Sequence, residues 1–256
     1  GAEASKMAAT TRVTGDRPRA PEARISRAQE LIERGEVSSA RQALMAEEVA
    51  PGTMDTLNRL RDPTRRLQNP REPIPRQVQE FQPAAPPPFP IAKFLKNLRG
   101  GKRGAASGPS GTTSEHLQVL LDDEASSELL HGAAAHLSAA DVPGEIVEAI
   151  RLGRLTALRK ADGGVRGIVV GDVLRRLVAR TLAQEFSEDF EAACAPFQYA
   201  LATRAGTECV AHVFQALSEA SPDTTILSID GIGAYDLMSR AAMLTGLMAV
   251  PRASAA

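Results

Sequence analysis

Eight prolines between residues 69 and 90 constrain this chain more than any other feature. Proline fixes φ and lacks the backbone N–H that a helix needs, so a run such as "PPPFP" excludes regular helix and favours extended, polyproline-type backbone. We interpret residues 69–90 as a linker between two parts of the chain. A ligand for a proline-recognition module is the alternative, and the composition alone favours the linker.

The length and the amino-acid composition exclude only a few classes of protein. At 256 residues with 43% hydrophobic content, the chain is long and apolar enough for one or two domains with a core. Because 31 Asp and Glu residues balance the 30 Lys and Arg residues, any positive surface must come from local clustering of cations. The two cysteines form no CxxC pair, and there is no signal-like or membrane-length apolar run. These features predict an intracellular protein with no disulfide and no membrane segment.

The N-terminal part precedes the proline-rich segment. Residues 1–20 are small, polar and basic without periodicity, which predicts a disordered lead-in. Residues 21–68 have apolar side chains at helical spacing, interrupted by Gly35, and predict a small helical hairpin with a third short helix near residues 53–60. The first residue is Gly1 and the chain stops at "PRASAA", which favours a fragment of a longer protein.

Two stretches after the linker are strongly basic. "KFLKNLRGGKRG", residues 93–104, contains five cations and no acid: Lys93, Lys96, Arg99, Lys102 and Arg103. Residues 151–180 contain eight basic side chains and two acids. Each stretch is either a solvated charged surface or a surface that faces phosphate groups.

The second basic stretch includes a predicted β-hairpin. "LTALRKADGGVRGIVVGD" reads as strands at residues 155–160 and 165–170, joined by a turn in which Asp-Gly-Gly supplies positive φ. Lys160 enters the turn and Arg166 leaves it. Cations at a hairpin tip suit a clamp on polyphosphate or nucleic acid, whereas the alternative is a charged edge that blocks strand association.

The last predicted strand ends at an aspartate. "TTILSID" has the composition of a buried strand that ends at Asp230. A carboxylate at a strand end can face a cleft, and Mg²⁺ prefers one or two carboxylates with water and phosphate oxygens in the other positions. Gly231 lets a backbone carbonyl approach the same ion, because it has no side chain. Taken alone, Asp230 is as well explained as a turn cap.

Three motifs in this order resemble a known family. "SIDGIGAYD" resembles the first palm motif of reverse transcriptases, D-x-x-x-A-[FY]-D, and "RKADGGVRGIVV" resembles their fingers segment, with Gly167 where proline is usual. "GPSGTTSEHL" resembles the turn and helix upstream of the fingers. Over residues 108–250 the chain therefore resembles the RNA-directed DNA polymerase of retrotransposons that lack long terminal repeats.

The resemblance implies a fold and a set of roles. The fold would be α+β and mostly helical, with a fingers-like hairpin and a truncated palm in residues 91–256. Asp230 would bind catalytic Mg²⁺ with the backbone carbonyl of Gly231, and Lys160 and Arg166 would hold the triphosphate. Tyr235 would lie under the incoming sugar and exclude a 2′-hydroxyl. The partners would be an RNA or DNA template–primer and deoxynucleotide triphosphates, joined by two-metal nucleotidyl transfer.

The second acidic motif of that family, an aromatic-x-Asp-Asp box, does not follow. None of the 20 residues after Asp236 is acidic, and the pair Asp122-Asp123 lies upstream at a predicted helix end. We therefore expect this chain by itself to be inactive as a polymerase. The alternative is a non-catalytic remnant that binds nucleic acid or a protein through the basic residues 151–180.

Overall fold

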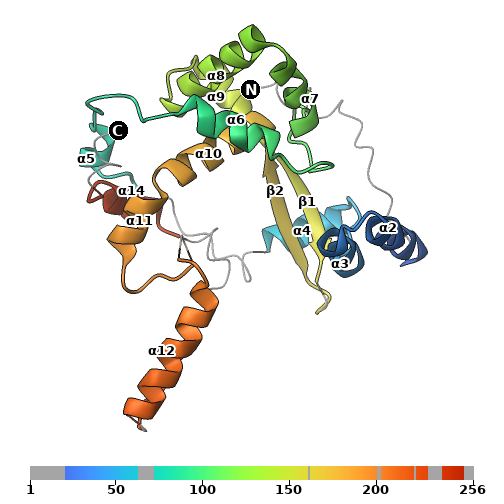
Figure 1. Cartoon of the computed structure of the whole chain (residues 1–256), viewed down its shortest axis with the longest axis vertical. Coiled ribbons are helices and arrows are strands. Elements are labelled where there is room, and N and C mark those ends of the chain that lie inside the picture. Colours follow the sequence, from blue (N-terminus) through green and yellow to red (C-terminus); the bar gives the residue numbers. More distant parts are fainter. Residues whose placement is uncertain are drawn as a thin grey trace. The chain divides into compact units, whose positions relative to one another are not determined.

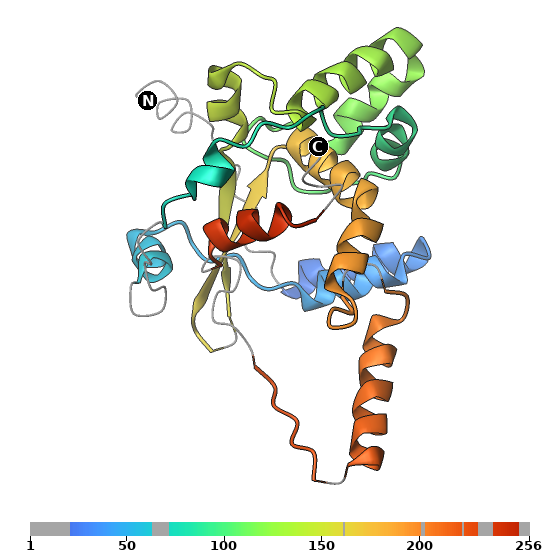
Figure 2. The same cartoon turned by 90° about the vertical axis from the view of Figure 1, so that its left-hand side faces the viewer.

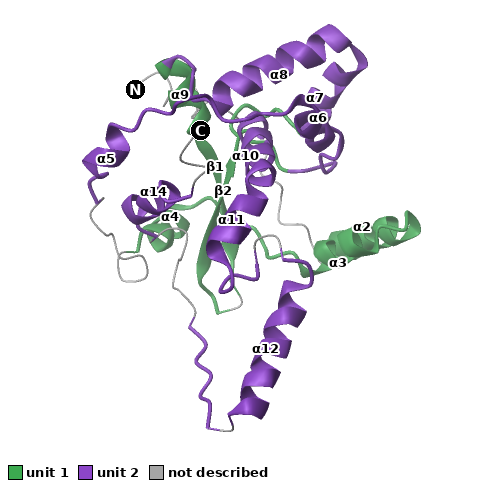
Figure 3. Cartoon of the chain, turned by 60° about the vertical axis from the view of Figure 1, so that its left-hand side comes forward, with its two compact units in different colours: residues 1–66, 106–113, 144–172 green, residues 67–105, 114–143, 173–256 purple. Residues whose placement is uncertain are grey.

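The computed structural model describes residues 21–62, 72–160, 162–200, 203–221, 223–229 and 238–250. In these ranges the chain is α+β and mostly helical, with one two-stranded antiparallel sheet (Figure 1), which confirms the fold class at that level. Two compact units alternate along the sequence (Figure 3). Unit 1 comprises the described residues of 1–66, 106–113 and 144–172, and unit 2 those of 67–105, 114–143 and 173–256.

The N-terminal helices of unit 1 form the predicted hairpin. Helices α2 (Pro21–Glu33) and α3 (Val37–Met45) pack through Ala28, Leu31 and Ala40. The small side chains of Ala28 and Ala40 let the two helices approach closely. Gly35 has the positive φ of 76° that ends the first helix. Helix α4 (Met54–Arg61) follows, as predicted, and α9 (Gly144–Ile150) belongs to the same unit.

The β-hairpin of unit 1 is also formed as predicted. Strand β1 (Gly153–Arg159) pairs with β2 (Val165–Gly171), and Arg159 lies opposite Val165 at the turn. In the turn, the Asp162 carboxylate accepts a hydrogen bond of 2.8 Å from the Gly164 N–H, and Gly163 has a φ of 78°. Local chemistry therefore explains the hairpin, because this turn needs a residue that tolerates positive φ.

The other edge of β1 is covered by residues that precede α4. Val49 forms an isolated antiparallel bridge with Leu158, and the Ala50 N–H donates to the Ala157 carbonyl at 2.8 Å. The Arg159 N–H donates to the Glu48 carbonyl at 2.7 Å. An uncovered strand edge leaves N–H and C=O groups without partners, and here the segment after α3 supplies them. The N-terminal helices and the hairpin are thus parts of one unit.

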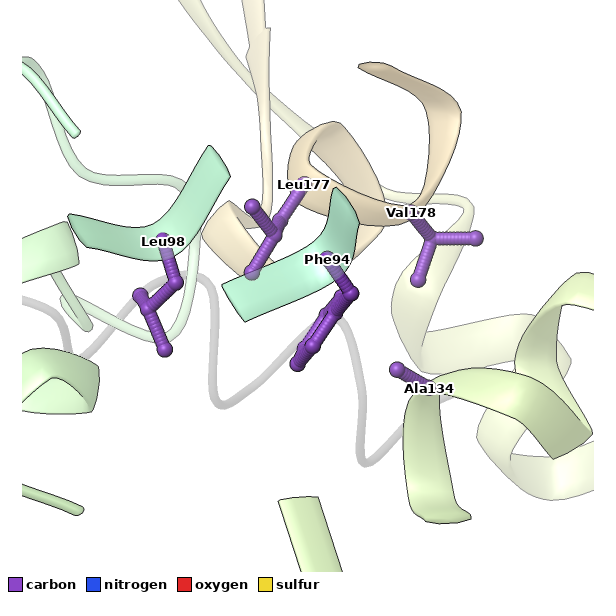
Figure 4. Close-up of a cluster of buried hydrophobic side chains, with 5 residues drawn as sticks. All are labelled: Phe94, Leu98, Ala134, Leu177 and Val178. Atoms are coloured by element: carbon purple, nitrogen blue, oxygen red, sulfur yellow. The ribbon is translucent and has the colours of Figure 1, made fainter. Parts of the chain in front are cut away.

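Unit 2 is helical. Its elements are α5 (Arg76–Gln79), α6 (Ile91–Arg99), α7 (Ser114–Gln118), the 3₁₀ turn η1 (Val119–Asp122), α8 (Glu124–Ser138), α10 (Val173–Glu185), α11 (Ser187–Cys194), α12 (Gly206–Ala220) and α14 (Arg240–Leu247). The core lies where α6, α8 and α10 meet, and Figure 4 shows its five buried side chains: Phe94, Leu98, Ala134, Leu177 and Val178. These residues recur at helical spacing within α6 and α10, which is why each helix buries one face.

The proline-rich segment packs within unit 2. One helical turn, α5, interrupts it, and Phe89 packs against the core. Residues 83–87 line an apolar groove of about 600 Å³ together with the end of α8 and with Phe186 and Phe190. The sequence predicts a linker here, and most of residues 83–88 are exposed. Phe89 is half-buried, and the packing of its apolar ring against the core is favourable.

Helix α12 stands apart from the other helices of unit 2 (Figures 1 and 2). It begins at Gly206. Apolar side chains recur at helical spacing on one face, but Val213, Phe214 and Leu217 are all exposed. Local spacing therefore determined the helix, while the described part of the chain provides no packing partner for its face.

Asp123 caps helix α8 and supplies a pH-dependent stabilisation. Its carboxylate accepts a hydrogen bond of 2.8 Å from the Ser126 N–H, so the acid predicted at a helix end is its N-cap. Hydrogen bonds from the Ser126 hydroxyl and then from its backbone hold the pKa of Asp123 below its ordinary value. A depressed pKa stabilises the fold above the unfolded-state pKa, and this contribution is lost as the pH falls through the folded-state pKa.

We therefore expect Asp123→Ala to lower the melting temperature near neutral pH. The difference from the wild-type protein should shrink as the pH falls through the folded-state pKa of Asp123, because the wild-type carboxyl then becomes protonated. Thermal unfolding followed by circular dichroism at several pH values measures this. A difference that stays constant down to the lowest pH would contradict the capping role of the carboxylate.

Candidate nucleic-acid interface

The hairpin brings Lys160 and Arg166 to the same end of the sheet, as the sequence predicts. The Lys160 N–H donates to the Gly164 carbonyl at 2.9 Å, so pairing continues one residue beyond β1. Arg166 lies opposite Leu158 in the ladder. Paired residues share a face of a sheet, as do residues two apart on one strand, so the backbone places Lys160 and Arg166 on one face.

Acidic side chains from the segment after α3 neutralise part of this surface. Arg166 forms an ion pair with Glu47 at 3.6 Å, and Arg159 forms one with Glu48 at 3.9 Å. All four side chains are partly exposed, so each pair contributes little to stability. Lys160 is exposed and has no acidic partner among the described residues. No pattern in the sequence indicates these pairs, since more than a hundred residues separate the partners.

Arg59 of α4 adds a further cation at the hairpin tip. Its Nη1 donates to the Gly163 carbonyl at 3.2 Å, and its Nε pairs with Asp55 at 2.9 Å. The first contact joins residues 104 positions apart in the chain. Sequence reasoning missed Arg59, because on the sequence it belongs to an ordinary i,i+4 pair on a helix surface. The turn is therefore held to α4 and is better described as a braced tip than as a free clamp.

The turn at residues 108–111 lies against the end of the hairpin. A Cβ on Gly108 would lie 2.5 Å from the Cα of Asp172 and 2.7 Å from the Gly171 carbonyl oxygen, so only glycine allows this approach. The Ser110 hydroxyl donates a short hydrogen bond to the Asp172 carboxylate. Asp172 directly follows β2. The turn at residues 108–111 is thus in contact with the end of the hairpin within unit 1.

The first palm motif lies outside the described residues. This applies to Asp230, Gly231, Tyr235 and Asp236. The residues that lead to it are described, and the predicted buried strand does not form there: residues 224–229 have no regular structure, and Leu227 is 78% exposed. A β-branched composition favours a strand only where a neighbouring strand supplies hydrogen bonds and a packing surface, and no described segment pairs with this one.

The described residues do not form a metal centre. No three His, Cys, Asp or Glu side chains gather in that part of the chain closely enough to hold an ion. The Asp122-Asp123 pair instead ends η1 and caps α8. The geometry of the described residues therefore does not support a fit to Mg²⁺.

No protein-family model, curated protein or solved structure matches this chain. None of the described helices is long and apolar enough to span a lipid bilayer.

Proposed function

We propose that this chain is the fingers part and first palm motif of an RNA-directed DNA polymerase of retrotransposon type, and that by itself it binds nucleic acid without polymerising. The observation that supports this most is the contact between the turn at residues 108–111 and the end of the hairpin. The order of the two motifs in the sequence does not require that contact. A turn that can approach Asp172 only through Gly108 is expected if the two motifs belong to one working unit.

Among the described residues, those at the hairpin tip support a role in phosphate binding. Lys160 and Arg166 share a face, and Arg59 reaches the same turn. In the proposal Lys160 and Arg166 hold the phosphates of an incoming nucleotide or of a nucleic-acid strand, because cationic side chains make charge-assisted hydrogen bonds to phosphate oxygens. Glu47 competes for Arg166, so binding requires that this exposed ion pair open.

The palm roles rest on the sequence resemblance alone. In the proposal Asp230, with the carbonyl of Gly231, contributes one set of ligands for magnesium, and Tyr235 discriminates against a 2′-hydroxyl. The sequence holds no aromatic-x-Asp-Asp box to supply the remaining carboxylates. We expect no primer extension by this chain with magnesium and deoxynucleotides, and template-directed extension would contradict the incomplete-site argument.

A second candidate is a non-catalytic nucleic-acid-binding remnant of such a domain. It is favoured by residues 224–229, which lead to the palm motif without forming a strand and expose Ile226 and Ile229. The two candidates differ in substrate choice. If the chain is the fingers and first palm motif of a polymerase, it should bind a primer–template more tightly than a single strand of the same length. A remnant that only attracts phosphates should bind both with equal affinity.

Acidic residues beside the hairpin provide the sharpest test of its role. We expect Glu47→Gln/Glu48→Gln to tighten primer–template binding by about three- to tenfold at low salt, because it releases Arg166 and Arg159 for phosphate contacts. Lys160→Gln/Arg166→Gln should weaken binding by a similar factor. Fluorescence anisotropy with a labelled RNA–DNA primer–template, repeated over a series of salt concentrations, measures both.

The matched control is Glu22→Gln/Glu33→Gln on α2. It changes the net charge by the same amount, and both residues are exposed and form no ion pair with the hairpin. If this control tightens binding as much as the Glu47/Glu48 variant, net charge and not the hairpin surface explains the effect. Binding that does not weaken with salt would contradict the role of the cations altogether.

A further inference from the structure

Two basic runs that are far apart in the sequence meet at one pocket in unit 2. The pocket has a volume of about 220 Å³ and lies between α6, the loop that follows it, and the first half of α10. Lys102 comes from the first basic run, and Arg176 and Arg180 come from α10. The two arginines are four residues apart, so they lie on one face of the helix. Three cations therefore surround a small concave surface.

The loop that carries Lys102 is held in place on both sides. A Cβ on Gly101 would lie 2.8 Å from the Ser114 Cβ and 3.0 Å from the Leu98 carbonyl oxygen, so the loop makes a close turn that glycine permits. At the other side, the Gly104 N–H donates to Glu115 Oε1 at 2.6 Å. Glu115 thus braces the backbone of the loop. Lys102 is presented to the pocket by a fixed turn.

The floor of the pocket is apolar and buried. Leu98, Val173 and Leu177 line it and are all less than 9% exposed. Beside them the buried Asn97 amide donates to the Thr181 hydroxyl at 3.1 Å, which in turn donates to the Leu177 carbonyl at 2.9 Å. Buried polar groups that are paired in this way fix the distance between α6 and α10. The cations at the rim are therefore carried by elements that keep their spacing.

The size and charge of the pocket select its ligand. Sites that enclose a whole small molecule usually measure about 300 Å³ or more, so this pocket suits a single anionic group whose remainder lies outside. Guanidinium groups are matched to phosphate, which they bind through paired hydrogen bonds. Exposed Arg99 and Arg103 extend the cationic surface along the same loop. Because cations extend beyond the pocket, they favour a ligand that has several phosphates along a chain.

A membrane surface fits less well than a nucleic acid. Insertion into a bilayer requires exposed apolar side chains next to the cations. Here the apolar residues of the pocket form its buried floor, and the other side chains at its rim are polar, cationic or small.

We propose that the pocket formed by Lys102, Arg176 and Arg180 binds phosphate groups of a single-stranded nucleic-acid backbone. The residues of this site all belong to unit 2, and none of them belongs to the hairpin motif on which the polymerase proposal relies. A nucleic-acid-binding protein without polymerase ancestry would use it in the same way, so the inference does not depend on the proposed function.

The test replaces the two helix arginines in the full chain. Arg176→Gln/Arg180→Gln should weaken binding of a labelled single-stranded RNA by about tenfold near 50 mM salt, and single-stranded DNA should respond alike because only phosphates are read. The slope of log affinity against log salt should become shallower by about 1.4, since each lost phosphate contact on a single strand removes about 0.7. Charge reversal by Lys102→Glu should weaken binding further. Fluorescence anisotropy gives each value.

The matched control is Arg204→Gln/Arg240→Gln, which removes the same charge at exposed positions of unit 2 that do not line the pocket. It should leave the slope within error of the wild-type value. Equal losses in the pocket variant and the control would overturn the proposal, as would binding to anionic phosphatidylserine vesicles in place of oligonucleotides. Circular dichroism checks that every variant is folded.

The two proposals fail separately. If Lys160→Gln/Arg166→Gln weakens binding and Arg176→Gln/Arg180→Gln does not, the phosphate pocket is overturned while the hairpin role stands. The reverse result supports the pocket and contradicts the proposed function of the hairpin. A wild-type chain that binds no nucleic acid at low salt overturns both.

Discussion

Phe94→Ala is expected to lower the free energy of unfolding of unit 2 by about 3–5 kcal/mol. Phe94 is fully buried where α6 meets α8 and α10 (Figure 4). Its ring centroid lies 5.5 Å from that of Phe89 and 5.7 Å from that of His131. Removal of the ring loses its burial and both aromatic contacts, and it leaves a cavity that rigid helices fill only in part.

Urea unfolding followed by circular dichroism measures the change, and hydrogen exchange of α6, α8 and α10 locates it. Phe197→Ala is the matched control, because Phe197 also lies in unit 2 but is 89% exposed. It should change the stability by less than about 0.5 kcal/mol. If the two variants unfold at the same urea concentration, the buried cluster is not the core of unit 2. Loss of exchange protection confined to α6 would also contradict a shared core.

Gly108→Ala should lower the stability of unit 1 by about 1–3 kcal/mol, as overpacked sites do. Its new Cβ would lie 2.5 Å from the Asp172 Cα and 2.7 Å from the Asp172 nitrogen. Backbone atoms cannot rotate away as a flexible side chain can, so the turn must leave the end of the hairpin. The Ser110–Asp172 hydrogen bond would then be lost. We expect faster hydrogen exchange in β2 and weaker primer–template binding.

Gly52→Ala is the control in the same unit, because a Cβ there meets no atom within 4 Å. Its stability and its hydrogen exchange should match those of the wild-type protein. Ser110→Ala separates the hydrogen bond from the steric contact, and it should have a smaller effect than Gly108→Ala. If Gly108→Ala behaves like Gly52→Ala, the turn does not rest on the hairpin, and the main support for the proposed function is lost.

Much of the secondary structure could be predicted from the sequence, because its causes are local. The hairpin turn follows from Asp-Gly-Gly, and the helices within residues 21–61 follow from apolar spacing within one segment. The prediction for residues 224–229 was wrong for the opposite reason. A strand is completed by a neighbour, and composition says nothing about whether that neighbour exists.

The candidate site could be predicted only in part. Lys160 and Arg166 are close because one turn joins them, which the sequence shows. Glu47 and Arg59 reach the hairpin from the N-terminal helices, which the sequence assigned to a separate segment. Long-range ion pairs and hydrogen bonds between exposed side chains leave no periodic pattern, so sequence reasoning had no means of finding them.

The sequence by itself determined which local elements form and where the cations are concentrated along the chain. Only the tertiary structure decided which of those cations lie beside acidic side chains and which lie together around one concave surface. In unit 1 the fold places Glu47 and Glu48 beside two of the hairpin arginines. In unit 2 it joins Lys102 to Arg176 and Arg180 around one pocket. The physical reason is that electrostatic attraction depends on distance in space, which only the packing of α6 against α10 and of residues 48–50 against β1 sets.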